Sequence, residues 1–427
     1  MLTKEENDLL TKVEGDAAMG KLMRQHWVPV CLSEEVDEPD GTPIRVEAIG
    51  RTYVCFRDTN GRLGLLDELC PHRKASLVFG RNEECGLRCL YHGWKFDVDG
   101  NCVSMASEPE GSPMHGTINQ PSYPVVECAG FVWAWLDSET EAPEFERPPF
   151  SPSEDSPIAI LKIRIPANWA QVVEGQIDSS HSSSLHSSDM VPASVARAAA
   201  DEESWYRPST DKAPRMQAEK TSYGFHYVAI RKPIKKSASH NYLRVTEFVA
   251  PFVSLIPPNS SYNVAAVIVP IDDESCNFHF IAWGGKACPK TDFWRKFTYA
   301  QKGIDLEDNW APKRSMENNF MQDRQVMKAG NFTGIQGIPN QDIAMWVSMG
   351  PRVDRSTDVL GSSDIGVGEF RRVMADAAAQ VAKGEPAIGT VAPRIPFANI
   401  SSKEGVFPKE MDWRQIDMSL EASAAAE

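Results

Sequence analysis

The stretches Cys70-Pro-His72 and Cys89-Leu-Tyr-His92-Gly-Trp94 determine how the rest of the chain is organised. Each stretch carries one cysteine and one histidine and is short enough to form a single loop. Two such loops can close on one metal centre, supplying two thiolates and two imidazoles. Pro71 stiffens the first loop, and Gly93 lets the second backbone pass close to a bound centre. The four ligands suit either zinc or an iron–sulfur cluster.

The order of the ligands along the chain separates these two alternatives. Zinc fingers usually place two cysteines in one knuckle and two histidines in the other, whereas both loops here are mixed. A Rieske [2Fe–2S] cluster binds one iron through two cysteines and the other iron through two histidines. Two mixed loops supply both pairs, Cys70 with Cys89 and His72 with His92. We therefore predict a Rieske cluster, with a structural zinc site as the alternative.

Composition narrows the class of protein. The 427 residues are 42% hydrophobic, enough for two domains with sizeable cores. A formal net charge of −15 disfavours binding to nucleic acid or to an anionic membrane surface. We see no apolar run of membrane-spanning length and no signal peptide. The nine cysteines have scattered spacing, so we expect no disulfide framework and a cytoplasmic location.

The hydrophobic pattern predicts an α+β chain in four parts. Residues 1–24 form an N-terminal helix with a capping box at Thr3 and Glu6. Residues 25–140 alternate in short runs and form an antiparallel β domain that carries both loops, and residues 141–157 form a linker rich in Pro and acidic residues. Residues 158–427 form a catalytic domain. Its expected strands are 158–165, 223–231, 241–250 and 262–271, its helices 168–180, 292–302, 316–328 and 368–382, and its long polar loop 187–221.

A second set of metal ligands lies in the pattern Glu174-x3-Asp178-x2-His181-x4-His186. On a helix, Glu174, Asp178 and His181 would share one face. The three serines after His181 are poor helix formers, so we expect the helix to end or bulge there and to turn His186 toward His181. Two imidazoles and one carboxylate form the facial triad of non-haem Fe(II) enzymes. The alternative is a surface loop rich in Ser and His that binds no metal.

Taken together, C-x-H…C-x-x-H followed by E-x3-D-x2-H-x4-H resembles the oxygenase component of the Rieske non-haem iron oxygenases over nearly the whole chain. Within that family the chain is most similar to the phthalate 4,5-dioxygenase type. The fold implied is a Rieske domain followed by a helix-grip-like catalytic domain, an antiparallel sheet flanked by helices. The segments that carry this similarity are Met321–Arg324, Gln341–Met345, Asp354–Asp364 and Arg371-Arg372.

The resemblance implies roles for individual residues. His181, His186 and Asp342 would bind a mononuclear iron. Asp178 would accept hydrogen bonds from His181 in one subunit and from a cluster ligand, His92, in the next. Such a bridge implies head-to-tail trimers, which stack into hexamers in some members. Three nearby carboxylates compete with Asp342 for the role of third ligand: Asp354, Asp358 and Asp364.

The resemblance also implies the reaction, which is cis-dihydroxylation of phthalate at positions 4 and 5 with O2. The chain has no G-x-G-x-x-G fingerprint after a strand, so electrons would come from a separate NAD(P)H-dependent reductase with flavin and iron–sulfur centres. A dianion approaching an acidic protein needs a local cationic clamp, and arginine matches carboxylates. Our candidates are Arg207, Arg244 and, more weakly, Ser179.

The sequence is also compatible with other functions. The same machinery could act on another aromatic acid, as in an isophthalate dioxygenase, a phenoxybenzoate dioxygenase or a vanillate-type O-demethylase. A chain from another class, a Rieske electron carrier without oxygenase activity, would share the cluster loops. The histidine pair in the second domain argues against the carrier.

Overall fold

The computed structural model describes residues 2–192, 205–258, 260–285, 287–392 and 396–416. The chain divides into two compact units. One comprises Val13–Phe145, and the other comprises Met1–Lys12 with Glu146–Glu427. Within the described ranges, none of the helices is long and apolar enough to cross a membrane.

The N-terminal segment differs from the single helix expected over residues 1–24. It forms two helices, α1 (Lys4–Thr11) and α2 (Ala18–Arg24). The capping box is present, because Thr3 Oγ1 accepts from the Glu6 N–H and the Glu6 carboxylate accepts from the Thr3 N–H. The break contains Gly15 at φ +57, a left-handed conformation that ends a helix at little cost for glycine. Helix α1 belongs to the larger unit and α2 to the smaller one.

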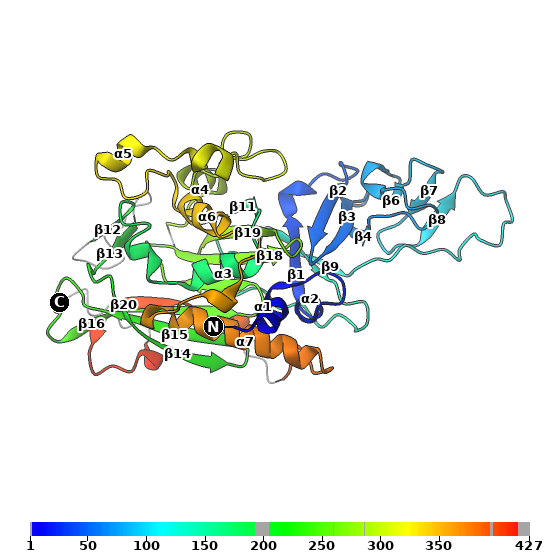
Figure 1. The fold of residues 1–427 in the computed structure, drawn as a ribbon. Helices are drawn as coiled ribbons and strands as arrows, with labels where there is room; N and C mark the ends of the chain where they lie inside the picture. Colours follow the sequence, from blue (N-terminus) through cyan, green and yellow to red (C-terminus); the bar gives the residue numbers. More distant parts are fainter. Residues whose placement is uncertain (1, 193–204, 259, 286, 393–395, 417–427) are drawn as a thin grey trace. The chain divides into compact units, whose positions relative to one another are not determined.

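The smaller unit consists of short antiparallel strands in three sheets (Figure 1). Buried Val54, Phe56, Leu66 and Phe96 form part of its core, together with the two cluster cysteines. The first cluster loop follows β4, and the second joins β6 to β7. The strands are β1 (Trp27–Leu32), β2 (Ile44–Ala48), β3 (Arg51–Arg57), β4 (Leu63–Asp67), β5 (Arg81–Glu83), β6 (Gly86–Arg88), β7 (Trp94–Phe96), β8 (Cys102–Met105), β9 (Val125–Cys128) and β10 (Phe131–Trp135).

The larger unit is built on an eight-stranded antiparallel sheet with the order β11-β19-β18-β17-β16-β15-β14, in which β20 also pairs with β16 (Figure 1). Strands β16, β18 and β19 have nearly continuous buried runs, which indicates that both faces of this part of the sheet are covered. The strands are β11 (Ile158–Ile165), β14 (Arg215–Thr221), β15 (Gly224–Arg231), β16 (His240–Val249), β17 (Val253–Ile256), β18 (Asn263–Pro270), β19 (Cys276–Trp283) and β20 (Lys403–Pro408).

Helices cover this sheet and carry the second metal site. Helix α3 (Trp169–Ile177) contacts β17 and β18, and α7 (Ile365–Val381) contacts β14 and β15. Helix α6 (Ile338–Ser348) contacts α3. The ring of Phe370 on α7 packs against Trp169 on α3 and Phe248 on β16, and this contact fixes both helices on the sheet.

Several elements depart from the sequence expectations. The polar loop expected over 187–221 contains a parallel pair, β12 (Met190–Pro192) and β13 (Trp205–Arg207), and the edge strand β14; its residues 193–204 lie outside the described ranges. Strand β14 is mostly polar, with Met216 as its buried residue, and it lies at the edge of the sheet. The helix expected over 316–328 is a 3-10 segment, Met316–Met321, followed by α5 (Arg324–Lys328). The last three residues of the 3-10 segment, Asn319–Met321, have left-handed backbone. Helix α6 was not expected.

Candidate metal centres

The two cluster loops have the same backbone hydrogen bonds. In the first loop, the Cys70 N–H donates to the Ala75 carbonyl and the Cys70 carbonyl accepts from the Lys74 N–H, both at 2.9 Å. The Cys89 loop repeats this pattern with Trp94 and Gly93, at 2.8 and 3.0 Å. The fourth residue after each cysteine is left-handed, at φ +60 for Lys74 and +72 for Gly93. Glycine suits position 93 because its φ is left-handed and because a Cβ there would lie 2.8 Å from the Ala106 Cβ.

The ligand side chains of these loops form two pairs. Cys70 and Cys89 are buried, whereas the His72 and His92 rings are half-buried, with centroids 4.3 Å apart. The Trp94 ring stacks on His72 at 4.5 Å and fixes its plane. Burial raises the pKa of the Cys70 thiol to about 11, so a bound cation is needed to hold it as thiolate. Desolvation and the neighbouring His72 and Arg73 lower the pKa of His92, which keeps that imidazole neutral and able to bind metal.

This arrangement fits a two-iron cluster better than a single zinc ion. A tetrahedral zinc site draws all four ligand atoms around one point. Among the described residues, the group whose ligand atoms lie within 4.8 Å of one another is His181, His186 and Asp342; the Cys/His loops form no such group. A buried thiol pair and a separate imidazole pair are what a Rieske cluster requires.

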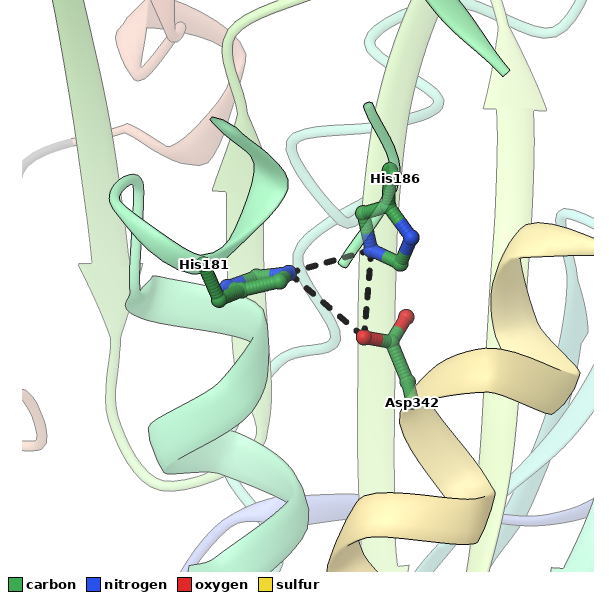
Figure 2. A group of neighbouring side chains, drawn as sticks. All are labelled: His181, His186 and Asp342. Atoms are coloured by element: carbon green, nitrogen blue, oxygen red, sulfur yellow. Dashed lines mark hydrogen bonds and ion pairs between the residues drawn. The ribbon is translucent and has the colours of Figure 1, made fainter. Parts of the chain in front are cut away.

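The second centre brings together three side chains from separate segments (Figure 2). His181 Nε2 lies 3.1 Å from His186 Nε2, and Asp342 Oδ1 lies 3.5 and 3.2 Å from these two nitrogen atoms. His181 belongs to a 3-10 turn, His181–Ser183, after α3, and Asp342 lies on α6. His186 and Asp342 are buried. Two imidazoles and one carboxylate on one side of a shared point have the ligand set of a non-haem iron triad.

The local chain path explains how the two histidines meet. Helix α3 ends at Ile177, one turn earlier than expected, so Asp178 and His181 do not continue the helical face of Glu174. Asp178 is the C-cap residue, and its Oδ1 accepts from the Ser180 N–H at 2.6 Å. The 3-10 turn then reverses the chain, and the His181 carbonyl accepts from the Leu185 N–H at 2.8 Å. The serines prevent continuation of the helix and allow this turn.

Each histidine has an acceptor beside its outer nitrogen. Asp178 Oδ2 lies 3.4 Å from His181 Nδ1, and Gln341 Oε1 lies 2.7 Å from His186 Nδ1. A proton on each Nδ1 suits these acceptors and leaves both Nε2 lone pairs directed toward Asp342 Oδ1. Three converging lone pairs repel one another unless a cation lies between them, so these residues fit a bound metal ion.

Gln341 was not among the predicted site residues. It is completely buried, and its Nε2 donates to Asp189 Oδ2 at 2.8 Å and to the Ile335 carbonyl at 2.9 Å. Both partners present oxygen acceptors, which directs the amide nitrogen toward them and the amide oxygen toward His186. The position directly before Asp342 was the available sequence signal, but nothing in the sequence shows which neighbour a glutamine contacts.

The carboxylate of Asp178 remains ionised in this environment. Burial raises its pKa, but hydrogen bonds and charge from His181 and the N–H groups of Ser180 and His181 lower it further than burial raises it. Conversely, burial lowers the pKa of His181, while Asp178 and Asp342 raise it, and the net shift is upward. Asp178 and His181 therefore each favour the charged form of the other at the end of α3.

Glu174 has a structural partner instead of a metal. Its Oε1 accepts from Arg355 Nε at 2.7 Å and from Arg371 Nε at 2.8 Å. Arg371 also donates to Asp358 at 2.7 Å. The other two competitors of Asp342 are used in turns, Asp354 accepting from the Ser356 N–H and Asp364 from the Gly361 N–H. Of the four candidate carboxylates, the structure brings Asp342 to the histidines.

A pocket next to the triad is lined in part by Asp178, Ser179, Tyr227, Arg244, Thr246 and Phe280. Arg244 is buried, and its Nη2 donates to the Pro257 carbonyl at 2.7 Å. Arg207 is also buried, and its Nη1 donates to Ser183 Oγ at 3.0 Å. Among the described residues, Arg207 is not one of those that line this pocket. Burial and the positive charge of Arg244 lower the pKa of Arg207, which shows that the two guanidinium groups repel each other electrostatically.

Comparisons with known proteins agree with these two centres. Residues 26–124 match the Rieske [2Fe-2S] domain, and residues 134–427 match the LigXa C-terminal domain like family. The chain is 57% identical, over 97% of its length and 94% of the relative, to the phthalate 4,5-dioxygenase oxygenase subunit of Pseudomonas putida. It is 33% identical, over 96% of both chains, to the 3-chlorobenzoate-3,4-dioxygenase oxygenase subunit of Comamonas testosteroni.

The solved structure of the terminal oxygenase of carbazole 1,9a-dioxygenase from Novosphingobium sp. KA1 has the same fold, with a TM-score of 0.55, 20% identity, and coverage of 86% of this chain and 94% of that one. The predicted α+β fold class is confirmed. The chain belongs to the Rieske non-haem iron oxygenases. Its cofactors are a Rieske [2Fe–2S] cluster and a mononuclear iron.

Proposed function

We propose that the chain is the cytoplasmic oxygenase component of a phthalate 4,5-dioxygenase, which adds both atoms of O2 to phthalate and forms the cis-4,5-dihydrodiol. The observation that carries this proposal is the pocket beside the His181–His186–Asp342 group, whose wall includes the buried Arg244. The relative with 57% identity supports the choice of phthalate among aromatic acids.

In this proposal Cys70, Cys89, His72 and His92 hold the cluster, and His181, His186 and Asp342 hold the iron. When bound, the cluster passes single electrons and the iron activates O2. The residues around the iron have their own tasks. Asp178 and Gln341 keep both Nε2 atoms unprotonated and fix the planes of the rings. Phe280 and Tyr227 supply apolar walls that exclude water from the aromatic ring of the substrate.

The carboxylates of phthalate need cationic partners because the protein as a whole is acidic. We assign Arg244, which lines the pocket, to one carboxylate and Arg207 to the second, with Ser179 as an additional hydrogen-bond donor. Buried guanidinium groups have lost their hydration, which costs free energy. An anionic ligand that pairs with them offsets this desolvation cost. This gives the pocket its preference for an aromatic acid over a neutral arene.

Electrons would reach the iron from the cluster of a neighbouring subunit in a trimer or in stacked trimers. We assign Asp178 to accept from His181 within one chain and from His92 of the next. Its ionised state and its position at the end of α3 support this role. Asp178→Asn should keep the full iron content and the cluster spectrum, yet stop cluster oxidation on addition of O2 and phthalate. Turnover at the wild-type rate would contradict the bridge.

We further propose that a separate NAD(P)H-dependent reductase supplies the electrons. Histidine ligation sets Rieske clusters at roughly −150 to +300 mV, so the cluster can accept electrons from a flavin or ferredoxin-type donor. A solved relative, the carbazole 1,9a-dioxygenase oxygenase, is described in complex with ferredoxin. The complex supports a protein donor in this case too.

The test is a substrate panel with a chemically reduced enzyme, which needs no reductase. Phthalate, isophthalate, 3-chlorobenzoate and vanillate are each mixed with the reduced holoenzyme and O2, and products are identified by mass spectrometry. We expect phthalate to give a cis-dihydrodiol and to accelerate cluster oxidation more than the other acids do. Demethylation of vanillate with inert phthalate would replace this function with that of an O-demethylase.

A further inference from the structure

Arg231, which the sequence did not single out, lies on the face of the sheet that lines the pocket. It is the last residue of β15 and pairs with Tyr242 of β16. In the same ladder, Tyr227 pairs with Thr246 and Ala229 with Arg244. Side chains of paired residues share a face, and residues two apart on a strand also share it. Arg231 therefore points to the same side as Arg244, a diagonal neighbour on the adjacent strand.

The guanidinium of Arg231 holds Ser179 by two atoms. Nη1 donates to Ser179 Oγ at 3.1 Å, and Nη2 donates to the Ser179 carbonyl at 2.7 Å. Because the Ser179 oxygen already accepts from Arg231, its own proton is left to be donated to another acceptor. Ser179 lines the pocket, so that acceptor can be a carboxylate oxygen of a bound substrate. A charged donor behind the hydroxyl also strengthens the hydrogen bond that the hydroxyl gives.

Arg231 also adds charge to the pocket. It is 2% exposed, and Arg207 and Arg244 are 7% and 6% exposed. Burial, followed by the charges of Arg244 and Arg207, lowers the pKa of Arg231 to about 10, so the group remains a cation near neutral pH. Within the described part of the chain, no carboxylate forms an ion pair with Arg207 or Arg231, and Arg231 Nε has no hydrogen-bond partner.

The balance of buried charge matches a dianion. Glu404, which accepts from Tyr242 at 2.8 Å, is the carboxylate whose charge acts on Arg244. Counted over the residues that the structure describes, the three guanidinium groups and this one carboxylate leave two positive charges. Asp178 and Asp342 face the metal site, where they would balance the charge of a bound divalent ion.

We propose that Arg231 is a positioning residue that orients the Ser179 hydroxyl toward a substrate carboxylate and supplies the charge by which the pocket selects a dicarboxylate over a monocarboxylate. This inference rests on the proposed function. Direct contact between Arg231 and the substrate is not part of it, since the residue acts through Ser179 and through its field.

The test compares phthalate with monomethyl phthalate, which has one negative charge fewer and one methyl group more, at a pH where the free carboxyl groups are ionised. Dissociation constants are measured by calorimetry under anaerobic conditions on the holoenzyme. Arg231→Met removes both the positive charge and the two hydrogen bonds to Ser179. Arg231→Lys keeps the charge but cannot make both hydrogen bonds to Ser179. Lys232→Met is the matched control, because it removes an exposed charge from the next position.

We expect Arg231→Met to weaken phthalate binding about thirty-fold and the monoester about three-fold. Arg231→Lys should restore most of the preference for phthalate while leaving its affinity below that of the wild type. Lys232→Met should bind both ligands as the wild type does. Equal losses for both ligands in Arg231→Met, or a lysine variant no better than the methionine variant, would overturn the inference.

A double-mutant cycle covers the case in which Arg231→Met folds poorly. Ser179→Ala should weaken phthalate about ten-fold, and in an Arg231→Lys background the same change should cost much less, because the hydroxyl is no longer oriented. Additive losses would refute the coupling. If the wild-type holoenzyme bound phthalate no better than its monoester, the proposed substrate would fail, and this inference with it. Wild-type selectivity that survives in Arg231→Met would refute the inference alone.

Discussion

The Nδ1 atom of His186 lies 2.7 Å from Oε1 of Gln341, and the amide of Gln341 is itself oriented by Asp189 and by the Ile335 carbonyl. This series of hydrogen bonds favours the proton of His186 on Nδ1 and leaves Nε2 as the ligand atom. Contacts of this kind around metal-binding histidines typically change metal affinity by about ten- to a hundred-fold.

Gln341→Leu should therefore lower the affinity of the mononuclear site for Fe(II) by about ten-fold or more, with the cluster spectrum unchanged. Iron content after dialysis against a weak chelator measures this. Gln171→Leu is the matched control, since Gln171 is equally buried but bonds only to the backbone of Trp346, Gly350 and Val353. Both variants should lose thermal stability. A similar loss of iron in the two would show that Gln341 acts only through packing.

Asp342→Asn should abolish binding of the mononuclear iron, because an amide oxygen carries no charge to balance the metal and binds it weakly. Asp364→Asn removes an acidic group from the same region of the sequence, where Asp364 caps a turn at Gly361. Metal analysis should find one mononuclear iron per chain in Asp364→Asn and almost none in Asp342→Asn. The reverse result would mean that the iron ligand set has been assigned to the wrong carboxylate.

The sequence could predict the cluster loops and the histidine pair because their ligands lie within a few positions of one another. Asp342 could be named only by resemblance, since its neighbours Asp354, Asp358 and Asp364 carry the same chemistry. What separates them is tertiary: α6 places Asp342 3.2 Å from His186, whereas Asp358 binds Arg371. Helix α6 itself was missed because it is buried on much of its surface and has little amphipathic pattern.

Arg231 and Gln341 could not be identified from sequence for a related reason. The register of β15 against β16 places Arg231 on the same face of the sheet as the pocket residues Tyr227 and Arg244, and sequence alone does not fix that register. The N-terminal pattern predicted one helix, but it did not show that α1 packs in the larger unit, where Asp8 pairs with Arg352 at 2.6 Å. Contacts between residues far apart in the chain set these features, and local propensity does not report them.

The ion pairs of His226 should make stability depend on pH. Burial lowers the pKa of His226, but Glu247 and Glu219 raise it more, and the net shift is upward. Tyr223 donates to the same Glu247, and Arg414 pairs with Glu219. A raised folded-state pKa means that the stabilisation is complete below the unfolded pKa and is lost as the pH rises through the folded one.

We therefore expect His226→Gln to lower the thermal unfolding temperature more at about pH 5.5 than at about pH 9, where His226 is neutral in both states. Melting curves of wild type and variant at the two pH values measure the difference. His240→Gln serves as the control, because His240, the first residue of β16, forms a hydrogen bond with the hydroxyl of Ser239. A penalty for His226→Gln that grew with pH would contradict the assigned direction.

The most direct test of the central claim is a single turnover with isotopically labelled oxygen. The holoenzyme is reduced anaerobically and mixed with phthalate and ¹⁸O₂, while the visible spectrum follows cluster oxidation. We predict that phthalate accelerates cluster oxidation and that the product is the cis-4,5-dihydrodiol with both oxygen atoms labelled. Unchanged phthalate, or a product carrying one labelled atom, would contradict the proposed dioxygenase.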